Sequence, residues 1–299
     1  MNRTPFILSA GIGAGAADAS NPLTLSRIAE LADAALIDLL LLGELSATTA
    51  SATRSAQGSF DPLLLAGWLS ARTHGVAVVP IVGALDSEPF HVARAMSAVD
   101  FLTKGRSGWL PTTLGTSAKL PKHDLVPKAQ DFIAATQSLW RSWDADALII
   151  DQASGVYLDP AKVRRSNYVG PFHQVLGPLN AARPPQGFPI LVMDEADPLS
   201  QAVTPEVLVV GQARLSAHAA QRCLLRVTPD NLTADILDAI DQSFRHGFID
   251  GLHLTMTAPT ADLESMTKNL LPALRQRELL TEQDRQQTLR TRLALPVPA

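Results

Sequence analysis

The stretch "DPLLLAGWLSARTHGVAVVPIVGALDSEPFHVARAMSAVDFLTKGRSGW", residues 61–109, shows the same pattern twice. A helical pattern over Phe60–Arg72 precedes the continuous apolar run Val76–Val82. An amphipathic helix over Pro89–Leu102 then precedes a strand-like run at Arg106–Thr113. A continuous apolar run is typical of a strand that is buried on both faces of a parallel sheet. The stretch therefore predicts parallel strands that alternate with helices.

The same alternation continues on both sides of this stretch. Further strands are expected at Phe6–Ser9, Leu36–Leu42, Pro189–Met193, Glu206–Val210, Cys223–Val227 and Gly251–Met256, and further helices at Leu23–Ala34, Leu125–Trp143, Arg214–Gln221, Thr233–His246 and Ala261–Gln276. Eight strands separated by helices predict an α/β fold of the (β/α)8 TIM-barrel type, with an open doubly wound sheet as the alternative. A chain of 299 residues suits one barrel domain over residues 1–299.

Two segments fall outside this alternation. Residues 144–187 are expected to form an irregular insertion before the fifth strand, and the insertion ends in the proline-containing motif "GPLNAARPPQG" at 177–187. Proline fixes φ and lacks an N–H donor, so this part is neither helix nor central strand. Loops of this length are lids, binding loops or linkers. Residues 277–299 are expected as a C-terminal helical tail that packs outside the barrel or is loose.

Composition limits the classes of function. The net charge is −4 and no basic run occurs, whereas nucleic-acid binding requires a clustered positive face. The single cysteine, Cys223, excludes an internal disulfide and is interpreted as a buried core residue rather than a nucleophile. The apolar run "ALIDLLLLG" contains Asp38 and is far shorter than the roughly 20 residues of a membrane span. No signal peptide is predicted, so a cytoplasmic protein is expected.

Four segments carry a resemblance to a known family. They are "EPFHVAR" at 88–94, "VDFLTKGRSGW" at 99–109, "GPLNAARPPQG" at 177–187 and "GFIDGLHLTM" at 247–256. With them, the chain resembles the bacterial luciferase-like monooxygenases. Within that family it is similar to the branch of nitrilotriacetate and dibenzothiophene-sulfone monooxygenases, as a shortened and divergent member. The resemblance implies a TIM barrel whose insertion runs over the barrel mouth.

The resemblance also implies a function. It indicates a two-component monooxygenase that oxygenates a small organic, sulfur- or nitrogen-containing substrate with O2. Reduced FMN would come from a separate NAD(P)H:flavin reductase. A homodimer through the helices near Phe60–Leu102 is the corresponding expectation for assembly.

Three residues are carried over as cofactor-binding candidates. Glu44 takes the place of an acid that lies near the flavin at the end of the second strand. Thr113 keeps a hydroxyl of the family pattern after the fourth strand, and His123 takes the place of a histidine at the start of the next helix. Neither a catalytic residue nor a resident metal is identified by the resemblance.

Other positions depart from the family pattern. The third-strand hydroxyls are replaced by Ile81–Leu85, which predicts an apolar core there. The loop that would hold the FMN phosphate reads "MDEADPLS", with carboxylates at Asp194, Glu195 and Asp197. Each like-charge pair would cost on the order of 4 kcal/mol at about 4 Å and an effective dielectric near 20. The three acids could instead form a solvated surface cluster or supply oxygen ligands to a divalent cation.

These departures support a second reading. The motifs that are kept are structural, whereas the altered positions are polar flavin contacts. The alternative is a degenerate luciferase-like barrel that has lost FMN binding and acts as a non-catalytic partner or regulatory subunit.

Overall fold

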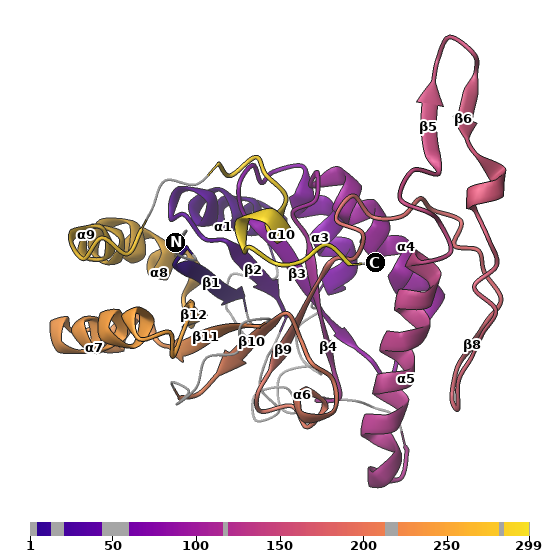
Figure 1. Ribbon diagram of the computed structural model, residues 1–299. Coiled ribbons are helices and arrows are strands. Elements are labelled where there is room, and N and C mark those ends of the chain that lie inside the picture. The colour runs from indigo at the N-terminus through magenta and orange to yellow at the C-terminus, as the bar shows by residue number, and fades with distance from the viewer. Residues whose placement is uncertain are drawn as a thin grey trace.

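The computed structural model describes residues 5–12, 21–43, 60–115, 119–212, 221–280 and 284–298. Eight parallel strands close into a barrel in the order β1–β12–β11–β10–β9–β4–β3–β2 (Figure 1). Their bounds are β1 Ile7–Ile12, β2 Leu39–Leu42, β3 Ala77–Gly83, β4 Gly108–Thr112, β9 Ile190–Asp194, β10 Val207–Val210, β11 Arg222–Val227 and β12 Gly251–Met256. The predicted TIM barrel is confirmed, and the open sheet is wrong.

Helices surround the strands. They are α1 Pro22–Ala34, α3 Pro62–Ser70, α4 Pro89–Leu102, α5 Lys122–Trp140, α6 Leu199–Ala202, α7 Ala234–Arg245, α8 Pro259–Ser265, the π-helical turn Met266–Leu270, α9 Leu271–Gln276 and α10 Leu289–Arg292. Short 3-10 turns lie at Pro160–Lys162 and Pro229–Asn231. Most of the helix expected at Arg214–Gln221 lies outside the described residues. Of the helices described, none combines the length and apolar character needed to cross a membrane.

Local sequence explains where helices begin. The side chain of Asn21 accepts a hydrogen bond of 2.9 Å from the Leu23 N–H at the start of α1. Asp61 does the same for the N–H groups of Leu63 and Leu64 at the start of α3. In both helices a proline follows the cap, because the first helical position needs no N–H donor.

Successive strand residues point alternately to the helices and into the barrel. On β1, Leu8, Ala10 and Ile12 pack in the layer between strands and helices, whereas Ile7 belongs to the inner core. The strand residues of that inner core are Ile7, Leu39, Leu41, Ala77, Val79, Ile81, Leu110, Ile190, Val192, Val207 and Leu224. The barrel is thus filled with side chains over most of its length. Cys223 lies in the outer core layer, as predicted for a buried residue.

The C-terminal tail closes one end of the barrel. Leu289, Leu293 and Leu295 belong to the same inner core as the strand residues. In Figure 1, α10 lies beside the N-terminal ends of the strands, and α6 lies at the opposite end. The expectation of a loose or externally packed tail is wrong, because its leucines cover apolar side chains that the open barrel end would leave in water.

Buried arginines fasten this tail. Arg292 pairs with Asp38, the acid that interrupts the apolar run of the second strand segment. Arg290 pairs with Glu206. Arg222 on β11 donates from Nε to the carbonyl of Leu293 at 2.8 Å. Buried charges are tolerated only when they are paired or hydrogen-bonded, so these contacts make the tail an integral part of the barrel.

The insertion lies between α5 and β9. It contains two antiparallel hairpins, β5 Leu148–Asp151 with β6 Val156–Leu158, and β7 Tyr168–Val169 with β8 Gln174–Val175. Figure 1 shows the β5–β6 hairpin projecting away from the barrel beyond α4 and α5.

Contacts with the outer helices hold the insertion in place. Asp131 on α5 accepts hydrogen bonds from the Tyr168 hydroxyl at 2.5 Å and from the His173 N–H at 2.6 Å. Burial, together with Asp131, raises the pKa of Tyr168 to about 12. Further along, Gln186 donates to Asp100 on α4 at 2.6 Å and to the Ser107 carbonyl at 2.9 Å, just before β4. The described part of the insertion therefore runs over α4 and α5 to the N-terminal end of β4, and the expectation that it covers the barrel mouth is wrong.

Candidate functional site at the C-terminal end of the barrel

Four inward-facing polar residues lie in the middle or at the C-terminal ends of neighbouring strands. Ser9 on β1 is aligned with His253 on β12, and His253 is aligned with Arg226 on β11. Asp194 ends β9, with β10 between it and Arg226. Aligned residues on neighbouring strands lie about 4.8 Å apart, so these side chains line one side of the barrel. We call Ser9, His253, Arg226 and Asp194 the polar arc, and this end of a barrel is where catalytic sites are built.

His253 is the most buried member of the polar arc. Its side chain is fully buried, and its Nδ1 lies 3.0 Å from the Ser9 hydroxyl. Its Nε2 has no hydrogen-bond partner in the described structure. Burial, with a smaller effect of the nearby Arg226 charge, lowers the pKa of His253 to about 3. At neutral pH the ring is therefore uncharged, with one nitrogen as donor and the other as acceptor.

Glycine at position 11 keeps one side of this ring clear. A Cβ added to Gly11 would lie 3.3 Å from both Cε1 and Nε2 of His253. Such a distance is tighter than an ordinary van der Waals contact, so a larger residue would press on the ring edge that carries the unpartnered nitrogen. The sequence thus combines a buried histidine with a neighbouring residue that has no side chain.

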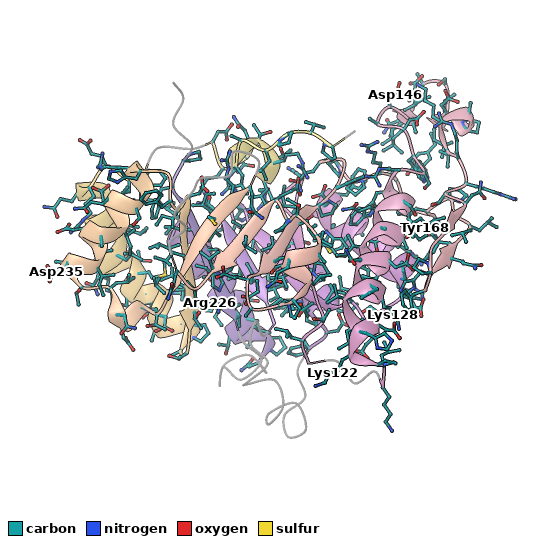
Figure 2. All side chains as sticks on the ribbon, turned by 60° about the horizontal axis from the view of Figure 1, so that its bottom comes forward. Lys122, Lys128, Asp146, Tyr168, Arg226 and Asp235 are labelled. Atoms are coloured by element: carbon teal, nitrogen blue, oxygen red, sulfur yellow. The ribbon has the colours of Figure 1, made fainter. Side chains whose placement is uncertain are left out.

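Arg226 and Asp194 form an ion pair. Arg226 Nη2 lies 2.6 Å from Asp194 Oδ2, but neither atom makes a hydrogen bond of good geometry, so we treat the contact as electrostatic. The Asp194 side chain is 3% exposed, whereas that of Arg226 is 31% exposed and reachable from solvent. Asp194 Oδ1 also accepts the Ala196 N–H at 2.9 Å. Figure 2 shows Arg226 among the barrel strands, while Lys122, Lys128 and Asp235 lie on helices outside them.

Asp197 is fully engaged by the end of β4. It accepts hydrogen bonds from the Thr112 hydroxyl at 2.7 Å, and from the Thr113 N–H and hydroxyl at 2.7 and 2.6 Å. It also accepts the Leu199 N–H at 3.0 Å, at the start of α6. This buried carboxylate therefore fastens β4 to α6.

The three acids of "MDEADPLS" do not form a solvated surface cluster. Asp194 and Asp197 are buried and have the partners described above, and only Glu195 is exposed. Glu195 accepts the Gly211 N–H at 3.0 Å. The interpretation as a surface cluster is wrong, because two of the three acids serve the packing of β4, α6 and β11. Among the described residues, no group of three or more His, Cys, Asp or Glu side chains is arranged to hold a metal ion.

The three cofactor-binding candidates inferred from the resemblance differ in their surroundings. Glu44 lies outside the described residues. Thr113 is buried, and Asp197 takes both of its donors. The His123 side chain, in the first turn of α5, is 81% exposed, and its Nε2 lies 3.5 Å from Asp124. Their roles as cofactor contacts remain predictions.

Sequence reasoning missed three members of the polar arc. Ser9, Arg226 and His253 each stand at an inward position of a strand whose other residues are mainly apolar. A polar residue at an inward strand position is a signal that could have identified them. Such a residue lowers the stability of the fold unless it has a hydrogen-bond or ionic partner, so its presence indicates a function. Their burial and pairing make them the centre of the candidate site.

The opposite side of the barrel is apolar. β2 and β3 contribute Leu41 and Ile81 to the inner core, whereas the following Val82, Ala84 and Leu85 are buried in the outer layer against the helices. The predicted apolar core at Ile81–Leu85 is confirmed for these residues. The C-terminal end of the barrel thus has a polar side on β9 to β1 and an apolar side on β2 and β3.

Several curated proteins are similar to this chain in sequence. No protein-family model matches the chain. N-acetyl-S-(2-succino)cysteine monooxygenase from Bacillus subtilis (strain 168) is 29% identical over 203 residues, which cover 64% of this chain and 46% of that protein. One subunit of pristinamycin IIA synthase from Streptomyces pristinaespiralis is 32% identical over 170 residues, 57% of each chain. Dibenzothiophene-sulfone monooxygenase from Rhodococcus erythropolis is 32% identical over 149 residues, 47% of this chain and 33% of that protein.

Solved structures share the fold. Riboflavin lyase with modified FMN and riboflavin has a TM-score of 0.78 at 20% identity, over 96% of this chain and 95% of that one. EDTA monooxygenase from Chelativorans sp. BNC1 has a TM-score of 0.77 at 16% identity, over 98% and 99%. At these identities the likeness shows the fold alone.

The chain therefore folds as a closed eight-stranded parallel barrel, and it shares this fold with EDTA monooxygenase. In sequence, the chain is similar to monooxygenases of the luciferase-like type, among them the dibenzothiophene-sulfone and nitrilotriacetate enzymes. The matches span about half the length, or less, of these curated relatives.

Proposed function

We propose that the chain is the oxygenase component of a two-component flavin-dependent monooxygenase that transfers oxygen from O2 to a small organic substrate. The proposal is supported by relatives named as monooxygenases and, within the barrel, by one observation. The middle of β12 holds a buried neutral histidine, His253, whose Nε2 has no partner among the described residues. A buried polar atom without a partner costs about 1–3 kcal/mol, so its retention points to a ligand that completes it.

Reduced FMN is the proposed cofactor, supplied by an NAD(P)H:flavin reductase. When bound, reduced FMN would supply the electrons that activate O2. The described residues suit a flat ring with one polar edge, because the apolar side carries Leu41 and Ile81 and the polar side carries Arg226 and His253. The negative charge of Asp194 is offset by Arg226, so of the three loop acids only Glu195 opposes the phosphate without a cationic or hydroxyl partner.

The residues of the polar arc would do three things. Arg226 would hold positive charge at the polar edge of the ring or of the substrate. His253, kept neutral by burial, would give or accept a hydrogen bond through Nε2 without exchanging its proton at neutral pH. Ser9 would fix the tautomer of His253 through Nδ1. The apolar strands opposite would limit the access of water.

The substrate is proposed to be a sulfur- or nitrogen-containing organic molecule. The names of two relatives specify N-acetyl-S-(2-succino)cysteine and dibenzothiophene sulfone, both of which contain sulfur, and a third specifies nitrilotriacetate. The proposed location is the cytoplasm, where a reductase can draw on NAD(P)H.

Anaerobic titration with reduced FMN tests the proposal. We expect binding in the micromolar range, followed by flavin fluorescence or calorimetry, and weaker binding by the Arg226→Gln variant. Arg164→Gln is the matched control, since Arg164 lies on the insertion and pairs with Asp144. Absence of binding at millimolar reduced FMN, with an intact circular dichroism spectrum, would overturn the oxygenase proposal.

A non-catalytic partner protein is the second candidate function. The relative that forms one subunit of a synthase matches this chain over 57% of each, so the two chains are of similar length. The capture of both Thr113 donors by Asp197 also favours this candidate, because a residue inferred to contact the flavin is already satisfied. It predicts that the chain does not bind reduced FMN by itself.

We further propose a homodimer through the face of α3. Leu64 is 76% exposed, and it lines an apolar groove with Phe60, Trp68 and Leu25 of α1. An exposed apolar groove of this kind is typical of an interaction site. Multi-angle light scattering should give the mass of a dimer for the native chain and of a monomer for Leu64→Glu. A monomeric native chain would contradict the proposal.

A further inference from the structure

We propose that the polar arc binds the carboxylate of an acidic organic substrate through Arg226 and His253. This inference rests on the proposed function, because it specifies a chemical group of the molecule that the oxygenase would act on. Its measurement needs no flavin, so the two proposals can fail separately.

The N–H donors of Arg226 are not used in hydrogen bonds within the described structure. Its guanidinium carries five N–H donors in a fixed fork, and its contact with Asp194 involves Nη2. The Arg226 side chain is 31% exposed, whereas the side chain of its partner Asp194 is only 3% exposed. A second carboxylate could therefore approach the guanidinium from the solvent side.

His253 supplies the second contact. When the Ser9 hydroxyl donates to Nδ1, Nε2 carries the proton and becomes a donor. This nitrogen is buried, lacks a partner in the described structure and lies beside Gly11, which carries no side chain. Because Arg226 and His253 are aligned on neighbouring strands, the two sets of donors lie on the same side of the barrel.

The charge balance favours a carboxylate over a phosphate. Arg226 and Asp194 together are neutral, so the site offers directed donors but no net positive charge. A monoanion that accepts two parallel N–H bonds suits the planar guanidinium fork. A dianionic phosphate carries one more negative charge than a carboxylate, and the neutral Arg226–Asp194 pair supplies no net positive charge to balance it.

Calorimetry of the full-length chain tests this inference, with succinate, acetate, acetamide and inorganic phosphate as probes at constant ionic strength. We expect succinate and acetate to bind at millimolar concentration or tighter, and acetamide at least tenfold more weakly. Arg226→Gln and His253→Gln should each weaken succinate binding at least tenfold, and Arg226→Lys should weaken it less than Arg226→Gln. Arg164→Gln on the insertion should leave binding unchanged.

The other outcomes are informative in different ways. Equal binding of acetamide and acetate, or undiminished succinate binding in Arg226→Gln, would overturn the inference. Phosphate binding tighter than succinate, lost in Arg226→Gln, would assign the site to a phosphate group and also overturn it. If Arg226→Gln does not fold, Arg226→Lys and His253→Gln decide the question. Succinate binding without reduced-FMN binding would keep the carboxylate site and remove the oxygenase proposal.

Discussion

Asp38 and Arg292, which are 254 residues apart in the chain, form a buried ion pair across the N-terminal end of the barrel. The two side chains are only 6% and 1% exposed. Asp38, which directly precedes β2, also accepts the Leu8 N–H at 3.0 Å. Its carboxylate therefore connects the start of β2 with β1 and with α10. The acid that interrupts an apolar run is thus the anchor of the C-terminal tail.

Removal of this anchor should be costly. Asp38→Ala leaves Arg292 as an uncompensated buried charge, and we expect the free energy of unfolding to fall by about 3–5 kcal/mol. Equilibrium urea denaturation measures this change. Glu30→Gln, in the exposed pair with Arg27, is the control and should cost less than about 1 kcal/mol. Similar costs for the two variants would mean that the pair does not hold the tail.

The leucines of the tail should behave as core residues. Leu293 is buried in the inner core, so Leu293→Ala should lower the free energy of unfolding by about 2–5 kcal/mol. Val297 lies in the same tail but is exposed, and Val297→Ala should change stability by less than about 0.5 kcal/mol. Thermal and urea unfolding of both variants measure the contrast. Equal effects would contradict the closing of the barrel end by this segment.

A substitution at Thr113 distinguishes a structural role of this residue from a role in cofactor binding. Thr113→Val keeps the shape but removes the hydroxyl donor to Asp197, which should cost about 1–3 kcal/mol of stability. We expect its affinity for reduced FMN to stay within twofold of the native value, measured in the same anaerobic titration. A stable variant with at least tenfold weaker flavin binding would instead support the role inferred from the family resemblance. His123→Ala, at an exposed position, is the companion variant and should unfold like the native chain.

His253 should make stability depend on pH. Its pKa is about 3 in the folded chain, against about 6.5 in an unfolded one, so below pH 6.5 the unfolded chain binds a proton that the folded chain does not. The stabilisation from this residue is complete above pH 6.5 and declines by about 1.4 kcal/mol per pH unit as the pH falls toward 3. Urea denaturation between pH 4.5 and 7.5 should show a shallower decline for His253→Gln.

The native curve of stability against pH contains opposing contributions. Burial raises the pKa of Asp100 and of Asp250, so these acids favour the folded chain as the pH falls. The difference between native chain and His253→Gln isolates the histidine, because both carry the same acids. Parallel curves for the two proteins would show that His253 is protonated equally in folded and unfolded chains.

Strand positions were predictable because burial on both faces leaves a direct trace in sequence. Leu39–Leu42 and Ala77–Gly83 are almost wholly apolar, since each faces helices on one side and the barrel core on the other. The helix at Pro89–Leu102 was predicted with its observed bounds, because it begins with proline and has an amphipathic pattern.

The insertion was predictable in position but not in path. Its prolines indicate a shaped loop, but Asp131 and Asp100, which hold it, lie on helices far from it in sequence. The partners of the carboxylates in "MDEADPLS" were likewise not predictable from the sequence. Their sequence suggests mutual repulsion, whereas Thr113 and Arg226, from other strands, supply the partners of Asp197 and Asp194.

The barrel could be derived from the sequence alone, because hydrophobic periodicity acts locally and requires no knowledge of distant neighbours. The candidate site, in contrast, depends on how the strands are arranged in the folded chain. Ser9, Asp194, Arg226 and His253 come together because the closed barrel places β1, β12, β11 and β9 in a fixed order and register. The burial that keeps His253 neutral, and the charge that Arg226 brings beside it, exist only after that closure.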